Sequence, residues 1–178
     1  HHTESDENTG NLRLLKTNAS NQINDFETIS SAPSNGWLAN GMNSSIWRII
    51  QNNSNLNSQS NMQLPNSGHQ NTSFLGTFGK GDLSSNTQTC IRSPIINVPR
   101  IILNYSITFQ HWLAIDSSDS VWVEYLSHNN VWTSLPISSN GGVNHWSGQT
   151  NDWQSVNISL DGLLSQNQPS TYFQFCLQ

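Results

Sequence analysis

The feature that most constrains the fold is an alternation of apolar and polar side chains along Leu103–Leu113. The odd positions are mostly apolar, as in Tyr105, Ile107 and Phe109, while most of the even positions are polar. This period of two is typical of a strand that turns one face to a core and the other face to solvent. A second clear strand, Val121–Leu126, follows soon after it.

Shorter patterns of the same kind run from Ile23 to the end of the chain, with Gly, Pro, Asn and Ser between them. The further predicted strands are Ser45–Ile50, Thr72–Phe78, Thr87–Ile91, Val131–Leu135, Trp153–Leu160 and Thr171–Leu177. No stretch shows a convincing amphipathic helix. Many short strands separated by turn residues predict an all-β fold, a sandwich or a barrel of antiparallel sheets.

The composition limits the kinds of partner that this chain can have. Its 178 residues suffice for one core, with 34% hydrophobic and only 10% charged residues, and seven Trp and six Phe supply apolar surface. The net charge is −5 and the six Lys and Arg are scattered, so we expect no nucleic acid partner. No long apolar run is present, which argues against membrane insertion. A Lys-poor sequence rich in Asn and Ser favours an extracellular or cell-surface location.

Two domain segments follow from these patterns: residues 1–21, an N-terminal tail, and residues 22–178, the β domain. The tail is polar except for Leu12-Arg13-Leu14-Leu15. One interpretation is a linker. The other is a docking strand, Leu12–Lys16, that adds to the exposed sheet edge of a neighbouring subunit, so that the protein assembles with itself.

The two cysteines, Cys90 and Cys176, both lie opposite apolar neighbours in their predicted strands. Ile91 follows Cys90, and Phe175 precedes Cys176, so both thiols leave the apolar face. This placement predicts a disulfide across two strands on the outer side of a sheet, although two unpaired thiols are the alternative. Because there is no Cys-x-x-Cys motif, a zinc or redox site is not expected.

Asn-x-Ser/Thr motifs make the chain a candidate glycoprotein. They occur at Asn18, Asn43, Asn52, Asn71, Asn104 and Asn157. In a sequence so rich in Asn, Ser and Thr, chance produces a similar number of these motifs, and they add little to the prediction.

Several motifs occur in an order that resembles a known family. These are Asp25-Phe26-Glu27, Gly36-Trp37, Ser93-Pro94, Phe109-Gln110-His111-Trp112 and Trp153–Leu160. They resemble the MAM-like jelly-roll domains of secreted microbial proteins, including the choice-of-anchor J group. The resemblance implies a concanavalin-like jelly roll of two antiparallel sheets. It also implies a non-catalytic role in adhesion, substrate targeting or surface structure.

The same resemblance implies a structural calcium ion near the opening acidic strand. Calcium prefers carboxylate and carbonyl oxygens. Glu27 is the best candidate ligand, together with Asp25 and backbone oxygens near His69. Asp82, Asp116 and Asp119 are weaker candidates, and for Asp116 and Asp119 we prefer the interpretation of solvated loop carboxylates.

We expect no enzymatic activity. The chain contains no Gly-x-Ser-x-Gly and no His-Glu-x-x-His motif. A glycosidase needs two carboxylates, and Glu124 has no acidic partner at short strand spacing. His111 alternates with Phe109 and Leu113, which predicts a hydrogen-bonded core side chain.

Four residues form a hypothetical ligand site. Trp112 shares a strand face with Gln110, and Trp122 shares one with Glu124. If the two strands are neighbours, these side chains lie on one exposed face that suits sugar rings. The alternative is that the tryptophans pack under loops or against a neighbouring subunit. We therefore expect an adhesion or cell-surface structural module that binds surface glycans or proteins. The alternative is a carbohydrate-binding module of a secreted hydrolase.

Overall fold

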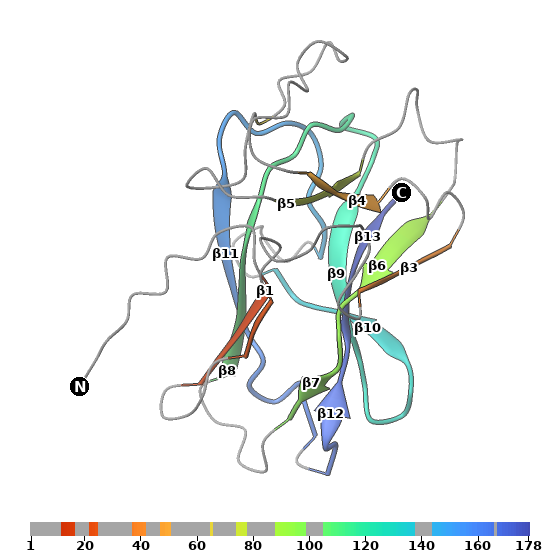
Figure 1. Cartoon of the computed structure of the whole chain (residues 1–178), viewed down its shortest axis with the longest axis vertical. Coiled ribbons are helices and arrows are strands. Elements are labelled where there is room, and N and C mark those ends of the chain that lie inside the picture. Colours follow the sequence, from red (N-terminus) through yellow and green to blue (C-terminus); the bar gives the residue numbers. More distant parts are fainter. Residues whose placement is uncertain are drawn as a thin grey trace, which may run out of the picture.

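The computed structural model describes residues 12–16, 22–24, 37–41, 47–50, 65, 74–77, 88–98, 105–137, 144–165 and 167–178. Within these residues the chain is all-β (Figure 1). The strands are β1 Leu12–Lys16, β2 Gln22–Asn24, β3 Leu38–Gly41, β4 Trp47–Ile50, β5 Phe74–Thr77, β6 Thr89–Arg92, β7 Ile96–Asn97, β8 Tyr105–His111, β9 Val121–Leu126, β10 Trp132–Ser134, β11 Gln154–Ser159, β12 Ser170–Thr171 and β13 Phe173–Leu177. None of the described residues forms a helix that could span a membrane.

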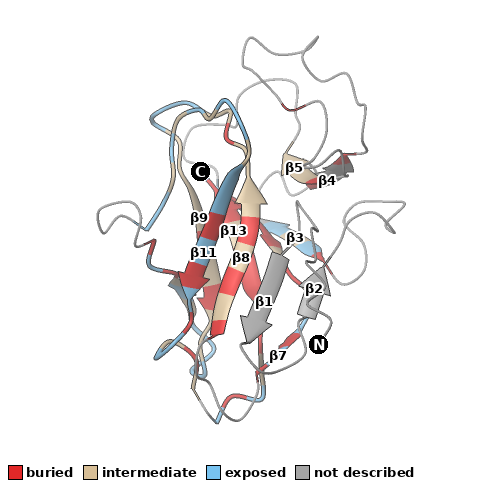
Figure 2. Cartoon of the chain, turned by 90° about the vertical axis from the view of Figure 1, so that its left-hand side faces the viewer, coloured by how far each residue is buried: buried red, intermediate tan, exposed pale blue. Residues whose placement is uncertain are grey.

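Two antiparallel sheets form the layers of a β-sandwich (Figure 2). The four-stranded sheet has the order β11-β8-β1-β2, and the five-stranded sheet has the order β10-β9-β13-β6-β3. One core cluster joins them: Ile107 and Phe109 come from the first sheet, and Ile91, Val123 and Phe173 come from the second. The pairs β4–β5 and β7–β12 are separate. The predicted antiparallel sandwich is confirmed, while the jelly-roll connectivity implied by the family resemblance remains a prediction.

Strand β8 has the alternation that the sequence predicts. Ile107 is fully buried and Phe109 is 7% exposed, while Ser106 and Thr108 between them are only half-buried. Its neighbour β11 alternates in the same way, with buried and exposed residues in turn along the strand (Figure 2). Each strand therefore presents one apolar face to the space between the sheets, and burial of that face stabilises the sandwich.

Strand β1 lies within the segment that the sequence assigns to the tail. Its backbone pairs with β8 of the same chain, from Arg13 opposite Thr108 to Lys16 opposite Tyr105, and on its other side with β2. Leu12–Lys16 thus forms a strand that pairs within its own chain. Docking of the same strand on a neighbouring subunit stays a prediction.

The connection between β8 and β9 crosses from one sheet to the other. Ala114 forms an antiparallel bridge with Gln149, and a turn in which Asp119 N donates to Asp116 O at 3.1 Å then leads into β9. Since β8 and β9 belong to different sheets, the two clearest strands in the sequence are not neighbours.

The predicted disulfide between Cys90 and Cys176 is confirmed. The two residues lie directly opposite each other on β6 and β13, with their Cα atoms 4.1 Å apart. Both are buried, and they lie on the sheet face opposite Ile91 and Phe175. The bond therefore joins two interior strands of the five-stranded sheet.

Replacing both Cys90 and Cys176 by Ala is expected to lower the free energy of unfolding by about 4–5 kcal/mol, because the bond closes a long loop in the unfolded chain. The sequence separation of 86 residues sets this expectation. Urea unfolding followed by circular dichroism measures the change. An unchanged midpoint would show that the bond contributes nothing to stability.

Candidate functional site

A cleft of about 210 Å³ lies between the sandwich and the β4–β5 pair, and aromatic side chains dominate its lining. Figure 1 shows β4 and β5 at the same end of the sandwich as the C-terminal end of β13. Five of the seven tryptophans line the cleft: Trp37, Trp47, Trp112, Trp146 and Trp153. Phe74, Phe109 and Phe175 line it as well.

One group of lining rings, the Trp153 group, consists of Trp112, Trp153 and Phe74. The ring centroids of Trp112 and Trp153 are 6.0 Å apart and those of Phe74 and Trp153 are 5.5 Å apart, both in edge-to-face geometry. The register of β8 and β11 explains the first contact. Gln154 pairs with His111, so the next residues outward, Trp153 and Trp112, become neighbours across the ladder.

A second group, the Phe109 group, consists of Phe109, Phe175, Trp146 and His111. Phe109 from β8 meets Phe175 from β13 edge to face at 5.1 Å, and it meets Trp146 in the same way at 5.8 Å. Trp146 is held by its backbone, since it exchanges two hydrogen bonds with Val121, each 2.8 Å long. Edge-to-face pairs of this kind stabilise by about 0.5–1.5 kcal/mol beyond the area that they bury.

His111 lies on the inward face at the end of β8, with its ring centroid 5.2 Å from that of Trp146. Burial lowers the pKa of His111 from 6.5 to about 4, so the ring is neutral at physiological pH. Its Nδ1 atom is buried and has no hydrogen-bond partner in the described part of the chain. The expectation of a packed histidine holds, but the expected hydrogen bond is not made at Nδ1.

The predicted ligand residues separate into two places. Gln110 and Trp112 line the cleft, and the Gln110 amide also donates to Ser155 Oγ at 3.1 Å. Trp122 and Glu124 lie on β9 in the other sheet. The hypothesis that all four share one exposed face is therefore wrong. The hypothesis fails because the connection after β8 crosses to the other sheet and does not form a hairpin with β9.

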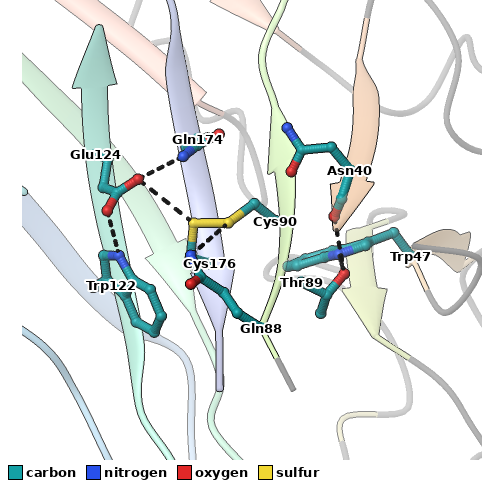
Figure 3. The surroundings of a disulfide bond; sticks show 9 residues. All are labelled: Asn40, Trp47, Gln88, Thr89, Cys90, Trp122, Glu124, Gln174 and Cys176. Carbon is teal, nitrogen blue, oxygen red and sulfur yellow. Dashed lines mark hydrogen bonds between the residues drawn. A yellow bond between two sulfur atoms is a disulfide. The ribbon is translucent and has the colours of Figure 1, made fainter. Parts of the chain in front are cut away.

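Trp122 and Glu124 instead lie on β9 beside the disulfide, next to Cys176 of β13 (Figure 3). Trp122 Nε1 donates to Glu124 Oε1 at 2.8 Å, and the Gln174 amide donates to Glu124 Oε2. That carboxylate oxygen also lies 3.9 Å from the sulfur of Cys176. Both carboxylate oxygens of Glu124 accept hydrogen bonds from this cluster, which links β9 to β13 on the sheet face opposite the core, while Gln174 Oε1 has no partner in the described part of the chain.

The metal and glycosylation predictions fall largely outside the described residues. This applies to Asp25, Glu27, Asp82, Asn18, Asn43, Asn52, Asn71 and Asn104. Asn157 is described and is exposed on β11. Asp116 is exposed and its Oδ1 accepts a 3.4 Å hydrogen bond from Ser118 N, as a solvated turn residue does. In the described part of the chain no three His, Cys, Asp or Glu side chains form a group that could hold a metal, and calcium stays a prediction.

The sequence interpretation missed most of the cleft. It assigned no ligand role to Trp37, Trp47, Trp146 or Trp153, although all four line the cavity with Trp112. One signal was available: a tryptophan stands at the end of one predicted strand and another at the start of a later one. The sequence does not show that these two tryptophans, Trp112 and Trp153, are in contact, because that depends on the pairing of β8 with β11.

No protein-family model, no curated protein and no solved structure matches this chain. The resemblance to MAM-like domains therefore remains a prediction from the motifs. Function has to be inferred from the geometry of the cleft itself.

The His111 environment predicts a loss of stability in acid. Between pH 6.5 and about 4 the unfolded chain binds a proton that the folded chain excludes, so stability falls as the pH falls through this window. The loss that depends on His111 should reach about 3 kcal/mol by pH 4.

Urea unfolding at pH 7, 5.5 and 4 measures this loss, with His111→Gln as the control that removes the titrating ring. The difference in free energy of unfolding between the wild type and His111→Gln should change with pH. The carboxylates contribute equally to both proteins, so their contribution drops out of this difference. If the free energies of unfolding of the two proteins followed parallel curves with pH, the lowered pKa of His111 would be contradicted.

Proposed function

We propose that this chain is a non-catalytic extracellular adhesion or cell-surface module that recognises its partner by holding one group of that partner in the aromatic cleft. The observation that carries the proposal is the gathering of five tryptophans around one cavity. Trp37 and Trp47 are buried, whereas Trp112, Trp146 and Trp153 are only partly buried. Burial of their remaining apolar area by a ligand would contribute about 25 cal/mol per Å².

The cleft walls are fixed before any ligand arrives. Ladder pairing places Trp112 beside Trp153, a backbone bridge holds Trp146, and edge-to-face contacts join the rings within each group. A preformed site does not spend binding free energy on ordering its own side chains. Concave sites with mostly apolar walls and few polar groups are typical of ligand-binding proteins.

The electrostatics of the cleft support recognition over catalysis. Among the described lining residues, His111 is the single group whose ordinary pKa lies near neutral pH, and burial lowers that pKa from 6.5 to about 4. General acid–base catalysis works best with a group whose pKa lies close to the operating pH. A neutral histidine between aromatic rings instead contributes a packing surface.

The disulfide supports the extracellular part of the proposal. Disulfides persist in oxidising compartments and are rare where cellular thiols keep cysteines reduced. The bond between Cys90 and Cys176 is fully built into the sheet, and both residues are buried. The Lys-poor, Asn-rich and Ser-rich sequence agrees with the same location.

The alternative function, a carbohydrate-binding module of a secreted hydrolase, would use the same cleft. It is favoured by the position of Gln110 next to Trp112 in the lining, an amide beside a flat ring. A module of that kind would bind a soluble oligosaccharide on its own.

A second function, assembly, is favoured by the position of β1. It pairs with β8 through backbone groups along four residue pairs, and such a ladder does not depend on which copy supplies the strand. Exchange of β1 between copies would join subunits without any new surface.

Replacing Trp153 or Trp112 by Ala is expected to weaken ligand binding about tenfold or more, because an aromatic anchor of a small site is lost. Ligands are sought by isothermal titration against a panel of oligosaccharides and small aromatic compounds. The matched control is Trp122→Ala on the outer face of the other sheet, which should bind as the wild type does. Equal losses in all three variants, or no binding by any compound, would contradict the proposal.

Deleting residues 1–20 tests assembly. If β1 exchanges between copies, the full chain forms dimers or longer assemblies and the shortened chain does not. Multi-angle light scattering over a range of protein concentrations separates the two cases. A full chain that stays monomeric at every concentration rules out the assembly function.

A further inference from the structure

We infer that the cleft takes an uncharged, flat, apolar ring system of one or two fused rings in preference to a sugar. The inference rests on the proposed function, because it names the chemical class of the group that the same cleft would hold. Four properties of the lining support it: the volume of the cleft, the arrangement of the rings, the content of polar groups and the absence of charge among the described residues.

The volume sets the size of the ligand. The cleft measures about 210 Å³. An engineered apolar cavity of roughly 150 Å³ holds benzene, and sites for drug-sized ligands start at roughly 300 Å³. A ligand of one or two fused rings lies between these limits, whereas a chain of several sugar units would leave most of its length outside.

The arrangement of the rings sets the shape of the ligand. Both the Trp153 group and the Phe109 group line the cleft. Trp112 and Trp153 meet at 72° and Phe109 and Trp146 at 86°, while His111 and Trp146 are tilted by 44°. Rings at such angles offer both faces and edges to the cavity. A flat aromatic ligand can meet both, since aromatic pairs prefer offset or edge-to-face contacts.

The polar groups decide against a sugar. Apart from the indole N–H groups, of which that of Trp47 donates to Thr89 Oγ1, the polar side chains in the described lining are Thr77, Gln110 and His111. Gln110 already donates to Ser155 Oγ, and Nδ1 of His111 is a buried atom that the cavity does not expose. A pyranose carries several hydroxyls, and each one buried without a partner weakens binding by roughly tenfold. An apolar ring has no such loss.

The lack of charged side chains in the described lining favours a neutral ligand. None of the described lining residues is Lys, Arg, Asp or Glu. An ionised group inside the cleft would lose its hydration and gain no opposite charge. A carboxylate or an ammonium group on the ligand is therefore expected to remain outside, in water.

The test compares indole with methyl β-glucopyranoside by isothermal titration of the full chain. Indole should bind with a Kd of about 1 mM or lower, as a small and efficient ligand does, and at least about tenfold more tightly than the pyranoside. Trp153→Ala should weaken indole binding about tenfold, and Trp122→Ala should leave it unchanged.

Two further variants keep the test independent of the stability of Trp153→Ala. Trp153→Phe retains a smaller ring and should give intermediate affinity. Ala114→Leu adds volume to the lining and should abolish indole binding while the thermal midpoint stays close to that of the wild type.

Each outcome decides a different point. A pyranoside that binds more tightly than indole and loses affinity in Trp153→Ala overturns the ligand class and leaves recognition by the cleft in place. Indole binding that survives both Trp153→Ala and Ala114→Leu overturns the inference, because the ring then binds elsewhere. If neither probe binds, the inference is overturned, and the wider panel of compounds decides separately whether the cleft binds anything.

Discussion

The contact between Phe109 and Phe175 is the interaction on which the rest of the structure depends. It joins β8 of the four-stranded sheet to β13 of the five-stranded sheet, with the two ring centroids 5.1 Å apart. Both strands lie inside their sheets, so this pair fixes how closely the layers approach. With only 34% hydrophobic residues in the chain, large rings have to supply much of the buried surface.

The cleft is a continuation of that core. Trp146 packs on Phe109, and Trp37 approaches Phe175 with 6.4 Å between ring centroids. Just beyond the last residue pair of the β8–β11 ladder, Trp112 and Trp153 add a further aromatic contact. The aromatic packing that holds the two sheets together therefore continues into the aromatic lining of the cleft.

Much of the fold follows from local patterns in the sequence. The alternation along β8 is strong because Tyr105, Ile107 and Phe109 all point inward, and β9 was predicted with the bounds Val121–Leu126 that it has. The disulfide was predictable because the pattern places both sulfurs on the same kind of face. In contrast, β3 has no alternating apolar residues in Leu38–Gly41, and it becomes a strand because its backbone pairs with β6.

The candidate site was harder to predict because it depends on which strands become neighbours. A period of two tells which way a side chain points, but not which sheet its strand joins. Gln110 and Trp112 were correctly placed on one face of their strand, and Trp122 and Glu124 of the other sheet were wrongly grouped with them. The partner of Trp112 is Trp153, which lies far along the chain, and only the β8–β11 register brings the two together.

The position of the disulfide also bears on how the domain would survive among proteases. The bond turns residues 90–176 into a covalent ring, and Trp112, Trp146 and Trp153 lie inside it. Exposed loops are where proteolytic cuts occur first. A single cut within the ring, for example at the exposed Asp116–Ser118 turn, leaves both pieces bonded to each other through interior strands. Those three walls of the cleft would therefore stay on one covalent molecule after such a cut.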